Sequence, residues 1–470
     1  MKKLLFLSCV LSVCIISGCN KNESSPNVKS VTLSKVGMTD ASYFVVVNPS
    51  KEALKSYNLK SDTIQREKTI PYLCTMTHSG ELEIVSFQYN MEGATDEAKA
   101  FVENNLFVVP TSFVSIGQNY IWLRDCRYYV TDETNCPAEL QTVISELKND
   151  IYQYVVRKKD GGILDLSEID HITRLYDNSD FYIPKGYISP TENGFYVLSS
   201  NLLKVTDNND SKPIIETVLP DNCLINSFVC QNDAIIAMGR ERSEDGIWKP
   251  MVFYPDGKID ILRLNTKVWD KASYDVIFSA NGIIYYVNCI KNELDQSELT
   301  TYRLTIGDNT VSVDSLCTQI VPFVYSDVAQ YLPRYTEEST VAFMNGNRLI
   351  SFSSETERFE MKEIAEFNNV VESFPSFDGC IYGYENNSLG KVYRYNLATT
   401  EVSELTIDKT AVVPFGYEPA PEFSASKNIF IQYGENTQGK DMTVVTDIAT
   451  QTAYYIEAEG KRVSSIYRIQ

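Results

Sequence analysis

Apolar and polar residues alternate in short runs along most of the chain, which is the pattern of β-strands with one buried face. Residues 393–402 show one such unit, in which an alternating run, a polar turn and a second alternating run follow one another. Comparable hairpin patterns begin near residues 55, 154, 203, 252, 301, 349 and 444. A further apolar strand precedes most of them. The pattern therefore predicts an all-β chain built from repeated units of three or four strands.

The repeat has a regular spacing. Equivalent positions lie near residues 59, 155, 206, 254, 304, 352, 397 and 448. From the second position onward the period is about 45 to 51 residues, and the first gap is about twice as long. This period is typical of β-propellers, in which small sheets close into a ring. We predict a β-propeller over residues 30–470, with eight blades favoured and seven as the alternative. Two tandem β-sandwiches are less favoured, because no linker of distinct composition divides the chain.

Two short segments carry a helical pattern instead. Residues 95–103 form a polar, helix-like stretch inside the long first gap of the repeat. Residues 137–147 place Leu140, Ile144 and Leu147 on one helical face, and Pro137 suits a first helical turn. The sequence thus predicts small helical inserts in the propeller.

The first nineteen residues have the pattern of a bacterial lipoprotein signal. Two lysines precede an apolar run that ends near Ile16, and this run is shorter than the ~20 residues of a membrane-spanning helix. Residues 16–19, Ile-Ser-Gly-Cys, then resemble a lipobox. The resemblance implies a signal peptide over residues 1–18, a lipid on Cys19 and a polar tether over the rest of 19–29. An ordinary secretory signal with an incidental cysteine is the alternative.

With its lipobox and its strands rich in Tyr and Asn, the chain resembles the extracytoplasmic propeller lipoproteins of Bacteroidota. It carries neither WD dipeptides nor recurring glycine pairs, so the resemblance extends to no named propeller family. Asn20 differs from the aspartate that retains lipoproteins in the inner membrane. The resemblance therefore implies a lipid-anchored protein of the outer membrane, attached to the membrane through its N-terminal lipid.

The charge of the chain excludes one class of partner. The sequence has 62 acidic against 42 basic residues, for a formal charge of −20. Nucleic-acid binding needs clustered Lys and Arg to neutralise phosphates, so DNA and RNA are not expected as partners.

Eleven cysteines occur, of which Cys9 and Cys14 belong to the signal and Cys19 to the lipobox. An extracytoplasmic location permits disulfides, and the close pairs Cys126/Cys136 and Cys223/Cys230 are the candidates. Because several cysteines lie in apolar runs, buried thiols are the favoured interpretation.

Histidine is scarce, with His78 and His171 as its two occurrences, and no Cys-x-x-Cys is present. We therefore predict no metal site. No phosphate-binding or dinucleotide motif occurs, and no cofactor is expected. Residues 207–211, Asp-Asn-Asn-Asp-Ser, resemble a calcium loop in their closely spaced oxygen ligands but lack its glycine and distal glutamate. Asx turns explain that segment better.

The loops between the second and third strands of the units are long and polar. They would form the mouth of a central channel, where propellers usually bind ligands. One of them carries Arg240, Glu241, Asp245 and Trp248, which we name as candidate ligand-binding residues. An acidic mouth would attract cationic partners, and a Trp is suited to stack on a sugar. Ordinary solvated loops and a structural Trp are the alternative.

A second candidate pair lies in the alternating run at residues 120–125. Trp122 and Arg124 point to the same face of that strand, with Asp125 on the other. Arg124 is a candidate to line the channel. The favoured alternative is a core Trp beside an Arg–Asp surface pair.

No catalytic residue is assigned from the sequence. A Gly-x-Ser-x-Gly motif is missing, and 62 acidic residues offer too many candidate carboxylate pairs. The sequence favours a lipid-anchored module that binds a glycan or a protein. A polysaccharide-active enzyme, either a glycosidase or a lyase with its site at the channel mouth, is the alternative. A purely structural partner in a surface complex is a third possibility, and the oligomeric state is left open.

Overall fold

The computed structural model describes most of the chain from residue 28 onward. The described residues are 28, 30–38, 41–49, 70–77, 79–169, 188–198, 201–220, 223–231, 234–241, 249–262, 264, 276–291, 296–307, 310–321, 340–345, 347–375, 379–385, 391–406, 413–414, 422–424, 429–436, 438–439, 441–447, 450–457 and 461–469. The predicted signal peptide, Cys19, most of the tether and the repeat unit expected near residue 55 lie outside them.

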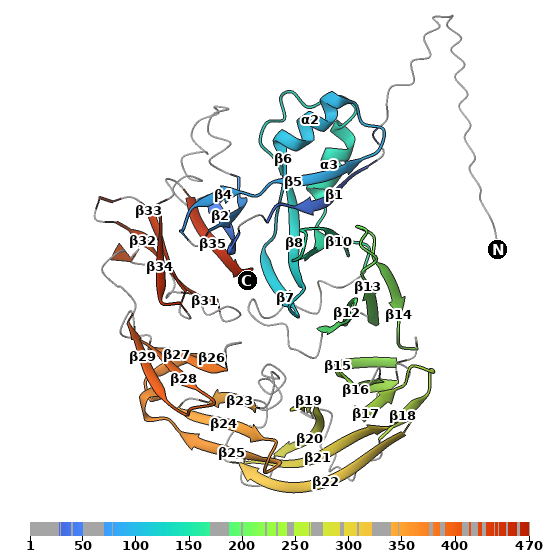
Figure 1. Ribbon diagram of the computed structural model, residues 1–470, viewed down its shortest axis with the longest axis vertical. Helices are drawn as coiled ribbons and strands as arrows, with labels where there is room; N and C mark the ends of the chain where they lie inside the picture. The colour runs from blue at the N-terminus through green and yellow to red at the C-terminus, as the bar shows by residue number, and fades with distance from the viewer. Residues whose placement is uncertain are drawn as a thin grey trace, which may run out of the picture.

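Antiparallel sheets follow one another around a ring (Figure 1). In a complete blade each strand pairs with the next, and successive strands lead from the centre of the ring to its rim. Six complete four-stranded blades are seen among the described residues. Their strands are β35 (Lys461–Arg468), β2 (Tyr43–Pro49), β3 (Tyr72–Met76) and β4 (Leu82–Ile84); β7 (Ser112–Ile116), β8 (Tyr120–Val130), β9 (Tyr152–Arg157) and β10 (Ile163–Asp165); β11 (Ile188–Thr191), β12 (Gly194–Leu198), β13 (Leu202–Thr206) and β14 (Ile214–Thr217); β15 (Cys223–Gln231), β16 (Ala234–Glu241), β17 (Lys249–Phe253) and β18 (Ile259–Ile261); β19 (Val276–Ala280), β20 (Ile283–Lys291), β21 (Ser297–Gly307) and β22 (Thr310–Val321); and β26 (Val370–Pro375), β27 (Cys380–Glu385), β28 (Lys391–Asn396) and β29 (Val402–Thr406).

Two further sheets depart from the four-stranded pattern. One has three strands in the part of the chain that the structure describes, β23 (Thr340–Asn345), β24 (Arg348–Ser353) and β25 (Arg358–Glu363). The other has β32 (Ile429–Glu435), β33 (Asp441–Asp447) and β34 (Thr452–Glu457), with two short segments, β30 (Val413–Pro414) and β31 (Glu422–Ser424), both paired to β32. The predicted all-β propeller is confirmed, but eight blades are not supported. The sequence reveals hairpins, which need two strands, whereas a complete blade needs four.

Alternation of side chains explains why both faces of a blade are buried. In β21, Leu299 and Thr301 lie on one face of the sheet and are buried. A β-bulge follows Thr301, and the buried positions shift to Tyr302 and Leu304 on the other face. Leu299 packs toward the blade that contains Phe352, whereas Leu304 packs with residues of the β15–β18 blade. The core therefore lies in layers between neighbouring blades.

The ring closes where an early strand of the chain pairs with its last strand. β2 pairs with β35 from Tyr43, opposite Arg468, to Pro49, opposite Lys461. The same β2 pairs on its other side with β3. One blade thus combines strands from both ends of the sequence, so that unravelling the ring requires this blade to separate.

A small insert covers one part of the ring (Figure 1). β1 (Val31–Val36) pairs with β5 (Phe87–Met91), and α2 (Asp96–Asn105) leads into β6 (Leu106–Val109), which pairs with the extended end of β8. The helix α3 (Gln141–Asn149) follows β8. Thr95 caps α2 by accepting a hydrogen bond from the Ala98 N–H at 3.2 Å. Both helices overlap the segments that the sequence predicted as helical inserts, but α3 begins at Gln141, so Pro137 precedes the helix instead of standing in its first turn. No helix among the described residues is long and apolar enough to cross a membrane.

Candidate functional site

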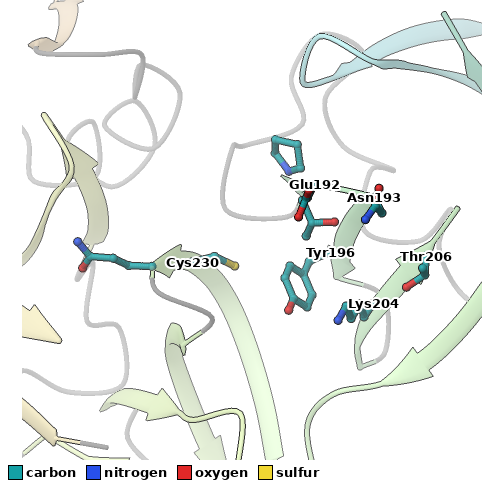
Figure 2. Close-up of a pocket in the computed structure, with 9 residues that line it drawn as sticks. Glu192, Asn193, Tyr196, Lys204, Thr206 and Cys230 are labelled. Carbon is teal, nitrogen blue, oxygen red and sulfur yellow. The ribbon is translucent and has the colours of Figure 1, made fainter. Parts of the chain in front are cut away.

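A pocket of about 390 Å³ opens between the β11–β14 blade and the β15–β18 blade (Figure 2). Its volume falls within the range of small-molecule sites. Nine residues line it: Pro190, Thr191, Glu192, Asn193, Tyr196, Lys204, Thr206, Cys230 and Gln231. Most of these side chains are polar, and Tyr196 provides an aromatic ring.

One wall of the pocket follows from the register of a strand pair. Tyr196 of β12 lies directly opposite Lys204 of β13, and Thr206 is two residues further on the same face. The opposite face of these strands carries Phe195 and Val205, both fully buried in the core shared with the preceding blade. Phe195 and Val205 therefore hold the sheet in place from behind. On the face toward the pocket, Leu198 and Leu202 are buried in the core with the next blade, and Tyr196, which packs against that core, Lys204 and Thr206 line the cavity.

A tight turn between β11 and β12 forms the rim of the pocket. Glu192 and Asn193 are exposed there. The Asn193 carbonyl accepts a hydrogen bond from the Asp207 N–H at 2.8 Å, which ties the turn to the end of β13. Gly194 has a φ of +151°, and a Cβ at that position would lie 2.0 Å from the Val205 carbonyl oxygen. The close approach of the two strands thus requires glycine beside Glu192 and Asn193.

The other wall belongs to the next blade. Cys230 and Gln231 end β15, and Figure 2 shows Cys230 across the cavity from Tyr196. The Gln231 side-chain amide donates to the Gly282 carbonyl at 2.7 Å, in the turn between β19 and β20. This bond anchors the end of β15 to a third blade and fixes this wall relative to its neighbours.

Three charged groups surround the face that carries Tyr196. Glu192 and Lys204 line the pocket, and Glu216 of β14 lies directly opposite Lys204 in the strand register. Glu216 is exposed, and Lys204 is partly buried. These three side chains sum to one negative charge, in line with the acidic character of the whole chain.

A buried ion pair connects the β11–β14 blade to the preceding blade. The Arg157 guanidinium lies 2.9 Å from Asp207, and the two side chains are 8% and 6% exposed. Tyr120 donates to the other oxygen of Asp207 at 3.1 Å. Burial, together with the neighbouring Asp207 carboxylate, raises the pKa of Tyr120 to about 12.

The Asx-rich segment 207–211 is explained by this pairing. Asp207 accepts from the Asn209 N–H at 2.8 Å, and Asn208 accepts from the Asp210 N–H at 3.1 Å. The Asp210 carbonyl accepts from Arg157 at 3.2 Å. The segment therefore uses its oxygen atoms for Asx turns and for Arg157, as the favoured interpretation predicted. Among the residues that the structure describes, no group of three or more His, Cys, Asp or Glu is placed to hold a metal.

Trp122 and Arg124 have different environments. Trp122 is 1% exposed, packs in the core between two blades, and donates from its indole N–H to Gln153 at 3.0 Å. It has no surface for a ligand in this arrangement. Arg124 is partly buried and lies 3.8 Å from Asp125. The core Trp and the Arg–Asp pair correspond to the alternative that the sequence favoured.

Two residues of the predicted channel mouth lie at the other end of the blade from the pocket. Arg240 and Glu241 end β16, at the end of the blade away from the turn that carries Gln231. Asp245, Trp248, His78 and His171 lie outside the described residues. The acidic mouth therefore stays a prediction. The described pocket was missed because its two walls come from different blades, and the turn at 192–194 marks a hairpin without marking a site.

The cysteines of the described chain form no disulfide. All eight that follow Cys19 are thiols. Cys223 and Cys230 begin and nearly end the same strand, β15, so their Cα atoms are roughly 20 Å or more apart at the usual rise per residue, far beyond the reach of a disulfide. Cys126 is fully buried and donates to the Leu123 carbonyl at 3.3 Å. Five of the eight thiols are buried and three are partly buried, so most match the favoured interpretation of buried thiols.

Comparison with known proteins finds solved structures that resemble this chain in fold but have low sequence identity to it. No protein-family model matches the chain, and no curated protein is a significant match. Among solved structures, puromycin hydrolase is 13% identical, with a TM-score of 0.37 over 77% of this chain and 55% of its own. Dipeptidyl peptidase 4 of Porphyromonas gingivalis is 10% identical, with a TM-score of 0.41 over 82% of this chain and 58% of its own. Virginiamycin B lyase of Staphylococcus aureus is 11% identical, with a TM-score of 0.34 over 78% and 97%. The chain thus spans little more than half the length of the two hydrolytic enzymes.

Proposed function

We propose that this protein is a lipid-anchored, outer-membrane binding module whose propeller binds a saccharide in the pocket between the β11–β14 and β15–β18 blades. The pocket carries the proposal for binding, and the lipobox at Cys19 carries the proposal for location. The candidates Trp122, Arg124, Arg240 and Glu241 do not line this pocket, and Asp245 and Trp248 lie outside the described residues. The proposal therefore takes Tyr196 and its neighbours as the site.

The single observation that supports a saccharide is the grouping of Tyr196 and Lys204 on one wall with Glu192 on the adjoining rim. An aromatic ring offers a flat apolar face for the C–H groups of a sugar, while its rim can be polar. Ammonium and carboxylate groups beside the ring form strong, charge-assisted hydrogen bonds with hydroxyls. Thr191, Asn193 and Thr206 add further polar side chains to the same lining.

Binding is favoured over glycoside hydrolysis because of the carboxylates. Most glycosidases use a pair of carboxyl groups that flank the scissile bond. Among the described residues that line the pocket, Glu192 is the one carboxylate. The enzyme alternative therefore draws no support from the pocket and depends on the predicted channel mouth.

A glycan array probed with the detergent-solubilised full chain tests the binding proposal. We expect binding to a subset of saccharides, with affinity lowered about tenfold or more in Tyr196→Ala, which corresponds to about 1.4 kcal/mol. Tyr196→Phe keeps the ring and its packing, and should bind nearly as well as the wild type. Tyr455→Ala removes an exposed tyrosine from β34, in another blade, and is the matched control.

Three results would contradict the proposal. The first is no saccharide binding, the second is an equal loss of affinity in the two alanine variants, and the third is release of cleaved sugar, which would favour the enzyme alternative.

Location is tested separately by Cys19→Ala. We expect this variant to leave the membrane fraction, and a variant that stays there would refute the lipid anchor.

A further inference from the structure

The charges around the pocket bear on which saccharides it accepts. Lys204 is the one cation of the lining, and Glu192 lines the same pocket. Glu216 faces Lys204 across the β13–β14 pair at a directly opposed position, where Cβ atoms are about 5 Å apart. The two carboxylates outnumber the ammonium group, and the chain around them carries a net charge of −20.

We infer that the pocket selects uncharged saccharides and rejects those that carry a carboxylate, with Glu192 and Glu216 as the residues that determine this specificity. This inference rests on the proposed function. A hydroxyl group can both donate to a carboxylate and accept from an ammonium group, so an uncharged sugar satisfies Glu192 and Lys204 together. A uronate can only accept, and beside Glu192 it meets a like charge.

The position of Lys204 strengthens the argument. A lysine that faces a pocket alone would attract an anionic ligand, but this one has a carboxylate directly across the strand pair. Part of its field is therefore already neutralised when a ligand arrives. Rejection of like charge is a common source of specificity at binding sites, because a like-charge contact is strongly unfavourable.

The test compares two matched ligands on the detergent-solubilised full chain. One is a tetrasaccharide of neutral hexoses, and the other is the same tetrasaccharide with one hexose oxidised to the uronate. Titration calorimetry at low salt gives both affinities. We expect the neutral ligand to bind about tenfold or more tightly than the uronate. Salt should narrow that ratio because it screens the repulsion.

The double variant Glu192→Gln/Glu216→Gln leaves Lys204 as the one charge at the wall. We expect its preference for the neutral ligand to shrink to about twofold or to reverse, since the repulsive groups are gone. Glu103→Gln/Glu146→Gln changes the total charge equally within the helical insert, where both side chains are exposed, and should keep the wild-type ratio.

The outcomes separate this inference from the proposed function. If the uronate binds the wild-type protein as tightly as the neutral ligand, the pocket binds saccharides but the charge argument is wrong. If the control variant shifts the ratio as much as the pocket variant does, the effect belongs to the whole chain and the inference is also overturned. If neither ligand binds and no other saccharide does, the proposed function fails, and this inference fails with it.

Discussion

The Tyr43 hydroxyl donates a hydrogen bond of 2.6 Å to the Asp447 carboxylate, across 404 positions of sequence. Tyr43 begins β2, and Asp447 ends β33 in the last sheet of the chain. Asp447 is fully buried, and Arg468 of β35 lies 3.4 Å from the same carboxylate oxygen. The Asp447 carboxylate thus connects three elements at the closure of the ring: β2, β35 and the sheet that contains β33.

Because the ring closes through this carboxylate, we expect small changes at Tyr43 and Asp447 to lower the free energy of unfolding strongly. Tyr43→Phe keeps the ring but leaves the buried carboxylate with one partner fewer, and we expect it to lower the free energy of unfolding by about 1.5–3 kcal/mol. Asp447→Ala also leaves the partly exposed Arg468 without this carboxylate and should cost more. Urea unfolding followed by fluorescence measures both variants. Tyr455→Phe, at an exposed site, is the control, and a Tyr43→Phe variant as stable as this control would contradict the prediction.

A second prediction concerns the β-bulge in β8. Asp125 has a φ of +49°, which an L-residue rarely adopts, and the register between β8 and β9 shifts beside it. The buried Gln153 stabilises this bulge, because its oxygen accepts from the Trp122 indole at 3.0 Å and its nitrogen donates to Asp125 at 2.7 Å. Gln153→Leu takes this acceptor away from the buried indole N–H and this donor away from Asp125.

We therefore expect Gln153→Leu to destabilise the protein by about 2–3 kcal/mol and to change the environment of Trp122. Near-ultraviolet circular dichroism at the Trp band and urea unfolding are the measurements. Gln118→Leu, at an exposed turn position, should leave both unchanged. If the Gln153→Leu variant is as stable as the Gln118→Leu variant, the amide does not hold the bulge.

The sequence predicted the strands and the two helical inserts because both depend on local periodicity. Alternation in β21 and the helical face of Leu140, Ile144 and Leu147 are visible in short windows. The number of complete blades could not be predicted in the same way. The sheet at β23–β25 has three strands among the described residues, and no residue pattern within its hairpins distinguishes it from a four-stranded blade.

The pocket could not be predicted for a related reason. Tyr196 and Lys204 are opposed by strand register, and Cys230 meets them only because two blades pack side by side. The sequence instead drew attention to residue type, since tryptophan is often found at binding sites. Trp122, for which the sequence favoured a place in the core, is there, and its polar N–H donates to Gln153.

Buried tyrosines predict a loss of stability in alkali. Burial, with further contributions from neighbouring groups, raises the pKa of Tyr152 and Tyr285 to about 12, and burial raises that of Tyr467 to about 12. An unfolded chain loses the same protons near pH 10. Because the pKa is higher in the folded state, the folded protein binds these protons more tightly. The resulting stability is complete below pH 10 and is lost as the pH rises toward 12.

We expect the urea midpoint to be constant up to about pH 9 and to fall steeply between pH 10 and pH 12. Phenolate absorbance near 295 nm should show a fraction of the tyrosines that titrate only when the protein unfolds. Tyr467→Phe should flatten the pH dependence slightly, because it removes one of the shifted groups. A midpoint that does not fall above pH 10 would show that these hydroxyls ionise as freely in the folded protein as in the unfolded chain.

The pair of Arg157 and Asp207 allows the cost of an unpaired buried charge to be measured. Their side chains are 8% and 6% exposed, and Asp207 also accepts from Tyr120. Asp207→Ala leaves the guanidinium buried with weaker partners, of which Asp160 at 3.3 Å is one. We expect a loss of about 3–5 kcal/mol in the free energy of unfolding. The double variant Arg157→Leu/Asp207→Leu removes both charges and should lose clearly less than the sum of the two single leucine variants.

The same pair also bears on the pocket, because the Asp207 N–H donates to the Asn193 carbonyl beside Glu192. The double variant keeps this backbone bond, so its saccharide affinity should stay within about twofold of the wild type at temperatures where it is folded. A double-mutant cycle in urea, with saccharide titration of each folded variant, separates the two effects. Purely additive losses in the cycle would mean that Arg157 and Asp207 stabilise the blade independently rather than as an ion pair.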